Sequence, residues 1–310
     1  MKKEDLLDQH NHVLALNNIN LDIKSKHIHV IMGLSGSGKS TLIRHVNRLI
    51  EPTSGKIIVD GKNMLEMSDD ELREFRRFKA SMVFQKFALL PHRSVIKNVA
   101  YGLLIQGVNK VEAYERSQKW IDKVSLNGYE NSYPYQLSGG MQQRVGLARA
   151  MATDAGILFM DEAFSSLDPL IRKSMQEILL DLQKELNKTI IFITHDLDEA
   201  LRIGDQISIL RDGAIIQTGS PEDILLEPKD KYISNFTKDI NRGRILKVSS
   251  IMKKKITIKA TKILHNIFIE DAIPIIAKSS EGEAAVVNNN GNIIGTVSLD
   301  SAISAISSKE

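Results

Sequence analysis

The chain has 310 residues, 42% of them hydrophobic and 25% charged, and its formal net charge is +3. These values exclude a collagen or a disordered chain, and so small a charge gives no indication of nucleic-acid binding. The length predicts about two domains. Without cysteine, the chain has no disulfide and no thiolate zinc site. No apolar run resembles a membrane-spanning helix or a signal peptide, so we expect a cytoplasmic protein.

The first part of the chain alternates between strand-like and helix-like segments. Short apolar runs predict strands at residues 13–16, 19–23, 27–32, 57–61 and 81–84. Ser68 and Glu71 form a capping box, which predicts a helix that continues to about residue 79. Residues 95–130 are expected to be mostly helical.

Two six-residue runs, 155–160 and 189–194, are apolar or β-branched throughout. Such runs are typical of strands buried on both faces of a parallel sheet. Between them, Asp168 is placed to cap a helix and Pro169 to open it. Residues 211–213 separate two further apolar runs and predict a hairpin. The pattern indicates an α/β fold.

Composition changes near residue 240. Residues 242–262 contain no acidic residue and eight basic ones, namely Arg242, Arg244, Lys247, Lys253, Lys254, Lys255, Lys259 and Lys262. A strand–turn–strand–helix pattern follows, with strands at residues 283–287 and 293–297, a turn at 288–291 and a helix from Leu299. We therefore expect a first domain over residues 1–242 and a second over 248–310.

One segment matches the phosphate-binding pattern G-x4-G-K-[ST]. It consists of Gly33, Leu34, Ser35, Gly36, Ser37, Gly38, Lys39, Ser40 and Thr41. Glycines let backbone amides approach phosphates at a helix N-terminus. In this pattern the lysine (Lys39) reaches the β- and γ-phosphates and the next hydroxyl (Ser40) ligates Mg²⁺. An apolar strand before the loop and a helical pattern after it support a nucleoside triphosphate site.

Two further segments carry chemistry. Asp161 and Glu162 follow a buried strand, where nucleotide clefts form in α/β sheets. Asp161 is placed to hold Mg²⁺ and Glu162 to polarise an attacking water. Ser138, Gly139 and Gly140 open a helix, whose N-terminus is a second anion site. Two phosphate-binding segments indicate either two nucleotides or one nucleotide shared between chains.

The order of these motifs, with Gln85 after a strand and His195 after another, resembles the ATP-binding subunits of ABC transporters over residues 13–225. The resemblance implies a P-loop NTPase core with an antiparallel β subdomain and a helical signature subdomain. It implies ATP and Mg²⁺ as cofactors. It also implies a head-to-tail homodimer, in which each ATP lies between the phosphate loop of one copy and residues 138–140 of the other.

The resemblance assigns roles to individual residues. Gln85 would ligate Mg²⁺ and couple to the membrane partner, Asp168 would organise the dimer seam, and His195 would contact the γ-phosphate. Members of the family place an aromatic residue upstream of the phosphate loop to stack on adenine. This chain has no Phe, Tyr or Trp before Phe75. His10 and His12 are the candidates that remain.

A narrower resemblance connects the chain with the proline/glycine betaine (quaternary amine) importer ATPases. It rests on residues 32–35, 47–53, 87–92, 160–165, 168–172 and 195–200. It implies an ATPase at the cytoplasmic face of the inner membrane that works with permease subunits and, indirectly, a substrate-binding protein. Choline, carnitine or trimethylamine oxide are alternative cargoes. An ABC ATPase without a transport role is a further alternative.

The C-terminal part resembles a regulatory unit of the same ATPases. Residues 292–300 look like part of a CBS repeat, and the chain has room for one such repeat after residue 248. The basic segment 242–262 has two interpretations. It is either a solvated linker or a contact with anionic lipid, which attracts basic residues near a membrane surface.

Overall fold

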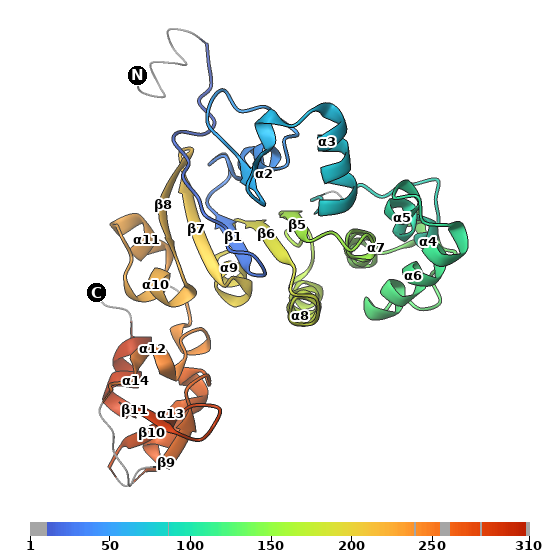
Figure 1. The fold of residues 1–310 in the computed structure, drawn as a ribbon. Coiled ribbons are helices and arrows are strands. Elements are labelled where there is room, and N and C mark those ends of the chain that lie inside the picture. The colour runs from blue at the N-terminus through green and yellow to red at the C-terminus, as the bar shows by residue number, and fades with distance from the viewer. Residues whose placement is uncertain (1–10, 86, 239, 255–260, 280, 308–310) are drawn as a thin grey trace. The chain divides into compact units, whose positions relative to one another are not determined.

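The computed structural model describes residues 11–85, 87–238, 240–254, 261–279 and 281–307 (Figure 1). The chain forms two compact units. The first extends to Asp196 and includes Ile203–Ile216, and the second combines Leu197–Arg202 with the chain from Gln217 onward. In the described part of the chain, no helix has the length and apolar character needed to cross a membrane.

The first unit is built on a six-stranded sheet with the order β4-β5-β6-β1-β7-β8. Its strands are β1 (Ile28–Met32), β4 (Ala80–Val83), β5 (Ile157–Asp161), β6 (Thr189–Thr194), β7 (Gln206–Arg211) and β8 (Ala214–Gly219). β1 pairs in parallel with β6 and β7, and β5 pairs in parallel with β4 and β6. The central strands are buried along almost their whole length, as their unbroken apolar runs predict.

Helices cover both sides of this sheet, with α2 on one side and α8 on the other (Figure 1). The helices of the first unit are α2 (Lys39–Val46), α3 (Asp69–Glu74), α4 (Val95–Val99), α5 (Tyr101–Ile105), α6 (Lys110–Lys123), α7 (Gly139–Ala152) and α8 (Pro169–Leu186). A π-helix, η2 (Phe75–Lys79), continues α3. The predicted capping box of Ser68 and the predicted cap by Asp168 are both confirmed.

The strands predicted at residues 13–16 and 19–23 are wrong, since residues 11–27 contain no strand. The alternation itself is real, because Leu16, Ile19, Leu21 and Ile23 are partly buried against the core while their neighbours are exposed. Alternation reports burial of one face, whereas a strand also needs a ladder of backbone bonds. The antiparallel pairing before β4 consists of the two-residue strands β2 (Ile58–Val59) and β3 (Lys62–Asn63).

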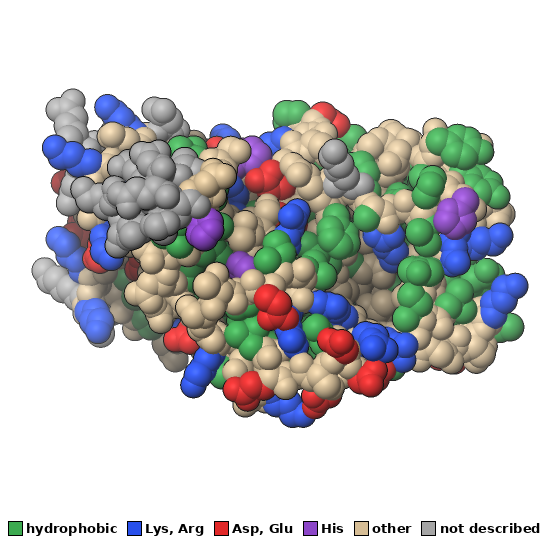
Figure 2. Space-filling view, turned by 90° about the horizontal axis from the view of Figure 1, so that it is seen from above, with side chains coloured by type: hydrophobic (Ala, Val, Ile, Leu, Met, Phe, Trp, Pro, Cys, Tyr) green, Lys and Arg blue, Asp and Glu red, His purple; other side chains and the backbone are tan. Residues whose placement is uncertain are grey.

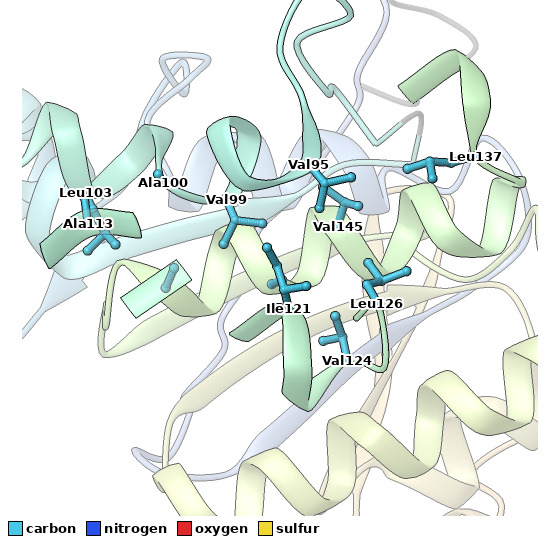
Figure 3. Packing of buried hydrophobic residues seen from close by; sticks show 12 residues of the cluster. Val95, Val99, Ala100, Leu103, Ala113, Ile121, Val124, Leu126, Leu137 and Val145 are labelled. Carbon is cyan, nitrogen blue, oxygen red and sulfur yellow. The ribbon is translucent and has the colours of Figure 1, made fainter. Parts of the chain in front are cut away.

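Helices α4 to α7 share a core of their own. Figure 3 shows Val95 of α4 beside Val145 of α7, with Ile121 of α6 in the same cluster. Val95, Val145 and Ile121 are fully buried. Trp120 is partly buried against the same cluster. This packing fixes α7, whose N-terminus carries the Ser-Gly-Gly segment.

The second unit contains a three-stranded sheet with the order β11-β10-β9. Its elements include β9 (Thr261–Leu264), β10 (Glu283–Val287), β11 (Ile293–Ser298), α10 (Pro221–Leu226), α11 (Lys231–Phe236), α12 (Val248–Ile251), α13 (Ile269–Ala277) and α14 (Leu299–Ile306). α9 (Leu197–Ile203) contributes all but its last residue. β10 pairs in parallel with β9 and antiparallel with β11, and the predicted strand–turn–strand–helix succession is confirmed.

A histidine lies inside the large sheet. His29 of β1 is 1% exposed, and its Nε2 hydrogen-bonds with the Ser208 hydroxyl over 2.8 Å. Its Nδ1 is buried without a partner. Burial lowers the pKa of His29 to about 4, because a charged ring would lose its hydration without gaining a counter-charge.

We expect the folded state to lose stability as the pH falls from about 6.5 to about 4. In this window the unfolded chain binds a proton at His29 that the folded chain does not, so lowering the pH favours unfolding, by about 3 kcal/mol in all. Urea unfolding across this range should show a shallower dependence on pH in His29→Gln. The exposed His92 gives the control, and equal slopes for wild type, His29→Gln and His92→Gln would contradict the prediction.

Candidate functional site

The phosphate loop lies between β1 and α2, at the carboxyl edge of the large sheet. Two of its glycines have positive φ, 78° at Gly36 and 102° at Gly38. Residues other than glycine rarely adopt this backbone conformation. A Cβ at Gly38 would also lie 2.8 Å from the carbonyl oxygen of Ala15, whereas a Cβ at Gly36 would meet open space. The loop therefore needs glycine at position 38 for two reasons.

Lys39 is buried at the first residue of α2. Its ammonium donates to the carbonyl oxygens of Gly33 (2.9 Å) and Leu34 (3.0 Å) and lies 3.7 Å from Glu162 Oε1. Burial lowers the pKa of Lys39, and the carboxylates of Glu162 and, to a smaller extent, Asp161 oppose that shift. The ammonium thus lies between the loop and the two acids, as a phosphate-binding lysine requires.

Ser40 and Asp161 meet at the same edge. The Ser40 hydroxyl donates to Asp161 Oδ1 over 2.8 Å, and Asp161 is almost completely buried at the end of β5. Oxygen donors of this kind suit Mg²⁺, which binds through few protein ligands and keeps several waters. Gln85, which contacts the neighbouring Glu162 through its amide nitrogen, offers a further amide oxygen, so the residues present fit the ion. No cluster of three or more acidic or histidine side chains able to hold a metal occurs among the described residues.

Glu162 contacts several of the other residues of the site. Its Oε2 accepts a hydrogen bond from Gln85 Nε2 (3.1 Å) and lies 3.6 Å from His195 Nδ1. Its backbone has a φ of 46°, unusual for a residue with a side chain. Its amide donates to the Ile193 carbonyl of β6 and its carbonyl accepts from Ser165, so bonds on both sides hold this strained conformation. Such strain concentrates at functional sites.

The structure brings six of the predicted residues together, namely Lys39, Ser40, Gln85, Asp161, Glu162 and His195. Ser138 instead caps α7, where its hydroxyl accepts from the Met141 amide. No hydrogen bond or ion pair of the described residues joins residues 138–140 to this cluster. A Cβ at Gly140 would lie 2.8 Å from Ile171 Cγ2, so this glycine permits α7 to pack on α8.

Asp168 accepts from the amides of Leu170 and Ile171 and so caps α8. The sequence did not single out Arg172, one turn later. Its guanidinium donates to the Leu167 carbonyl (3.0 Å) and to Asp196 Oδ2 (3.1 Å), which joins the loop before α8 to the turn after β6. A lone arginine on a helix gives no signal of this contact. Of the proposed adenine contacts, His12 is exposed and His10 lies outside the described residues.

A groove of about 370 Å³ lies near Gln85 in the first unit. Its lining includes Phe84, Ala88, Leu90, Tyr101 and Arg149. Figure 2 shows a hollowed surface with hydrophobic side chains gathered along one side of it. The loop after β4 therefore forms part of a concave surface and, through Gln85, reaches Glu162.

Comparison with known proteins shows the family of the chain. The family model described as "ABC transporter" matches residues 16–165. The chain is 49% identical to the glycine betaine/carnitine transport ATP-binding protein GbuA of Listeria monocytogenes, over 95% of this chain and 73% of that protein. The chain belongs to the ABC transporter ATP-binding proteins. As a member of this family, it uses ATP with Mg²⁺.

Other relatives of this ABC ATPase extend the comparison. It is 54% identical to the glycine betaine transport ATP-binding protein OpuAA of Bacillus subtilis over 84% of its own length, but spans only 62% of that relative. The solved dimeric structure of a bacterial ABC transporter cassette matches with a TM-score of 0.63 at 36% identity, over 67% of this chain and 90% of that chain. The predicted P-loop ABC ATPase fold is confirmed.

We expect Gly38→Ala to destabilise the first unit by about 2–4 kcal/mol, because a positive φ and an overlap with the Ala15 carbonyl both disfavour a side chain there. Gly36→Ala is the matched control, since it adds the same methyl group in open space. Only its positive φ should lower the free energy of unfolding, by about 1 kcal/mol. Urea unfolding measures both variants. Equal losses would contradict the role assigned to the contact at Gly38.

Proposed function

We propose that the chain is the ATP-hydrolysing subunit of an importer for glycine betaine, proline or a similar osmolyte. The observation that carries the proposal is the sequence identity of this chain with two glycine betaine transport ATP-binding proteins. For the Listeria relative, the match covers nearly all of this chain. The clustered side chains of Lys39, Asp161 and Glu162 supply the chemistry that such a subunit needs. An ABC ATPase without a transport role is the less favoured alternative.

Each residue of the cluster has a separate role in this proposal. Loop amides and Lys39 bind the β- and γ-phosphates. Ser40, Asp161 and Gln85 would hold Mg²⁺, which neutralises phosphate charge when it is bound. Glu162 orients and polarises the attacking water, and His195, 3.6 Å from Glu162, contacts the γ-phosphate. Phosphoryl transfer depends mainly on such positioning and charge stabilisation.

Residues 138–140 complete the site from a second copy. Within one chain, no hydrogen bond or ion pair of the described residues joins them to the cluster. Together with the anion-binding character of a helix N-terminus, this supports a nucleotide shared between two copies. Asp168 would contribute to the seam of this homodimer. Membership of a family with a dimeric solved structure supports the same arrangement.

Permease subunits are the proposed occupants of the groove beside Gln85. The groove offers apolar side chains such as Phe84 and Leu90 beside the guanidinium of Arg149. A helix or loop of a membrane partner at the cytoplasmic face would touch the same loop that carries Gln85. A substrate-binding protein would act through the permease and not contact this chain.

Which osmolyte is transported is a separate and more specific proposal. The ATPase does not touch the osmolyte, so choline, carnitine and trimethylamine oxide stand beside glycine betaine and proline. Purification of the chain from solubilised membranes with its partners discriminates between these cargoes. A binding protein with an aromatic cage would indicate a quaternary ammonium compound.

We also propose that residues 1–242 form the ATP-binding domain and that residues 248–310 form a single CBS-like regulatory unit. The succession β10, turn, β11 and α14 supports the second part of this proposal. Contact with anionic lipid is proposed for the basic segment 242–262. Arg244 contributes less to it than the sequence suggests, because its guanidinium pairs with Glu270 over 2.9 Å. Lys255 and Lys259 lie outside the described residues.

Replacing Glu162 tests the hydrolytic role. Glu162→Gln keeps the size of the side chain but removes its charge, so the ATPase rate should fall by about 10²–10⁴. ATP should still bind, and the dimer should accumulate, as measured by gel filtration with ATP. Glu115→Gln, which removes an exposed carboxylate on α6, should leave the rate unchanged. A Glu162→Gln variant that turns over ATP at the wild-type rate would overturn the assignment.

Replacing Lys253 and Lys254, two exposed lysines of the basic segment, tests the lipid contact. Each basic residue contributes about 1 kcal/mol near an anionic surface, so the double Gln variant should bind anionic vesicles roughly thirtyfold less at low salt. Lys229→Gln with Lys231→Gln removes the same charge from another exposed segment and should have little effect. Equal binding of both double variants in vesicle sedimentation would leave the solvated-linker interpretation.

A further inference from the structure

Two adjacent residues of the loop after β4 have an uncommon backbone conformation. Phe87 has a φ of 57° and Ala88 a φ of 47°, the left-handed region that residues with side chains avoid. Two such residues in succession are costly, and they persist only where surrounding contacts hold them. They lie two and three residues after Gln85, which contacts Glu162.

Arg149 supplies the contact that holds this strained pair. From the last turn of α7, its Nη2 donates to the Phe87 carbonyl (2.9 Å) and its Nη1 to the Ala88 carbonyl (2.7 Å). The planar guanidinium therefore bridges two consecutive carbonyl groups with two separate nitrogens. Lysine has the same charge but lacks two N–H groups in a fixed planar arrangement, so it cannot make this paired contact. Burial lowers the pKa of Arg149, yet the group remains a cation at neutral pH.

Other contacts hold the two ends of the loop. On one side Gln85 donates to Glu162. On the other, the buried Asn98 of α4 accepts from the Leu90 amide and donates to the Leu90 carbonyl. Arg149 acts between these two anchors. It also lines the groove together with Ala88 and Leu90, so an occupant of the groove would lie against the same contact.

α7 connects this contact with the second half of the proposed site. The helix begins after Ser138 and keeps one continuous run to Ala152, so Arg149 lies about 16 Å along the same rod from the Ser-Gly-Gly segment. A rigid helix transmits a displacement of one end to the other. A movement of residues 138–140 would thus reach the loop through Arg149.

We propose that Arg149 is a positioning residue that holds Phe87 and Ala88 in the left-handed conformation, and thereby couples α7 and the groove to the contact of Gln85 with Glu162. The proposal rests on the hydrolytic role proposed for this cluster and adds its control by the groove. Arg149 does not touch the nucleotide. It acts on hydrolysis only through Gln85.

The first test measures the loop without measuring activity. In Arg149→Lys, hydrogen–deuterium exchange at residues 87–90 should rise. The matched control is Arg116→Lys, because Arg116 donates to a single carbonyl, that of Ala152 at the same end of α7, and otherwise pairs with Glu112. Unchanged exchange in Arg149→Lys, or an equal rise in the control, would overturn the proposal even if the chain hydrolyses ATP as proposed.

The second test combines Arg149→Lys with Gln85→Ala. Arg149→Lys alone should lower kcat about tenfold or more through misplacement of Gln85, with KM for ATP changed less than about twofold. In the Gln85→Ala background, the same substitution should cause less than about a twofold further loss, because residues that act through one another are not additive. If the two substitutions instead reduced kcat independently, so that the loss in the double variant equalled the product of the two single losses, Arg149 would have a merely structural role. Failure of the hydrolytic proposal would instead appear as wild-type turnover in Glu162→Gln.

Discussion

Parallel pairing of β1, β6 and β5 is the constraint on which the site depends. Parallel strands end at the same edge of a sheet, and the register aligns Met32 with Thr194 and Asp161 with Ile193. The residues that follow these strands are the phosphate loop, His195 and Glu162. They meet because of that register, although more than 160 positions separate Gly33 from His195 in the chain.

Glu162 shows how the same edge supports chemistry. It contacts Lys39, Gln85 and His195, each from a different segment. Its left-handed backbone is held by the Ile193 carbonyl of the neighbouring strand. Hydrogen bonds from elements distant in sequence thus stabilise the strained backbone at Glu162 and at the residues after Gln85. Such strain is common where a functional side chain must point in one direction.

Local patterns predicted much of the fold. Capping at Ser68 and Asp168 and the buried runs of β5 and β6 depend on neighbouring residues and were correct. The strands predicted at residues 13–16 and 19–23 were wrong for a physical reason. Alternating burial needs only a core on one side, whereas a strand needs a partner for its backbone groups. Which segments become partners is not a local property.

The sequence by itself determined which residues are candidates for the site, because a phosphate loop needs glycines and a lysine at fixed spacing and the acids follow a recognisable buried strand. Tertiary structure decided which side chains meet. The contacts of Arg149 with the Gln85 loop and of Arg172 with Asp196 span 61 and 24 positions, respectively. An arginine on a helix carries no local sign of the carbonyl or carboxylate it will reach, since that contact exists only once the helix is packed.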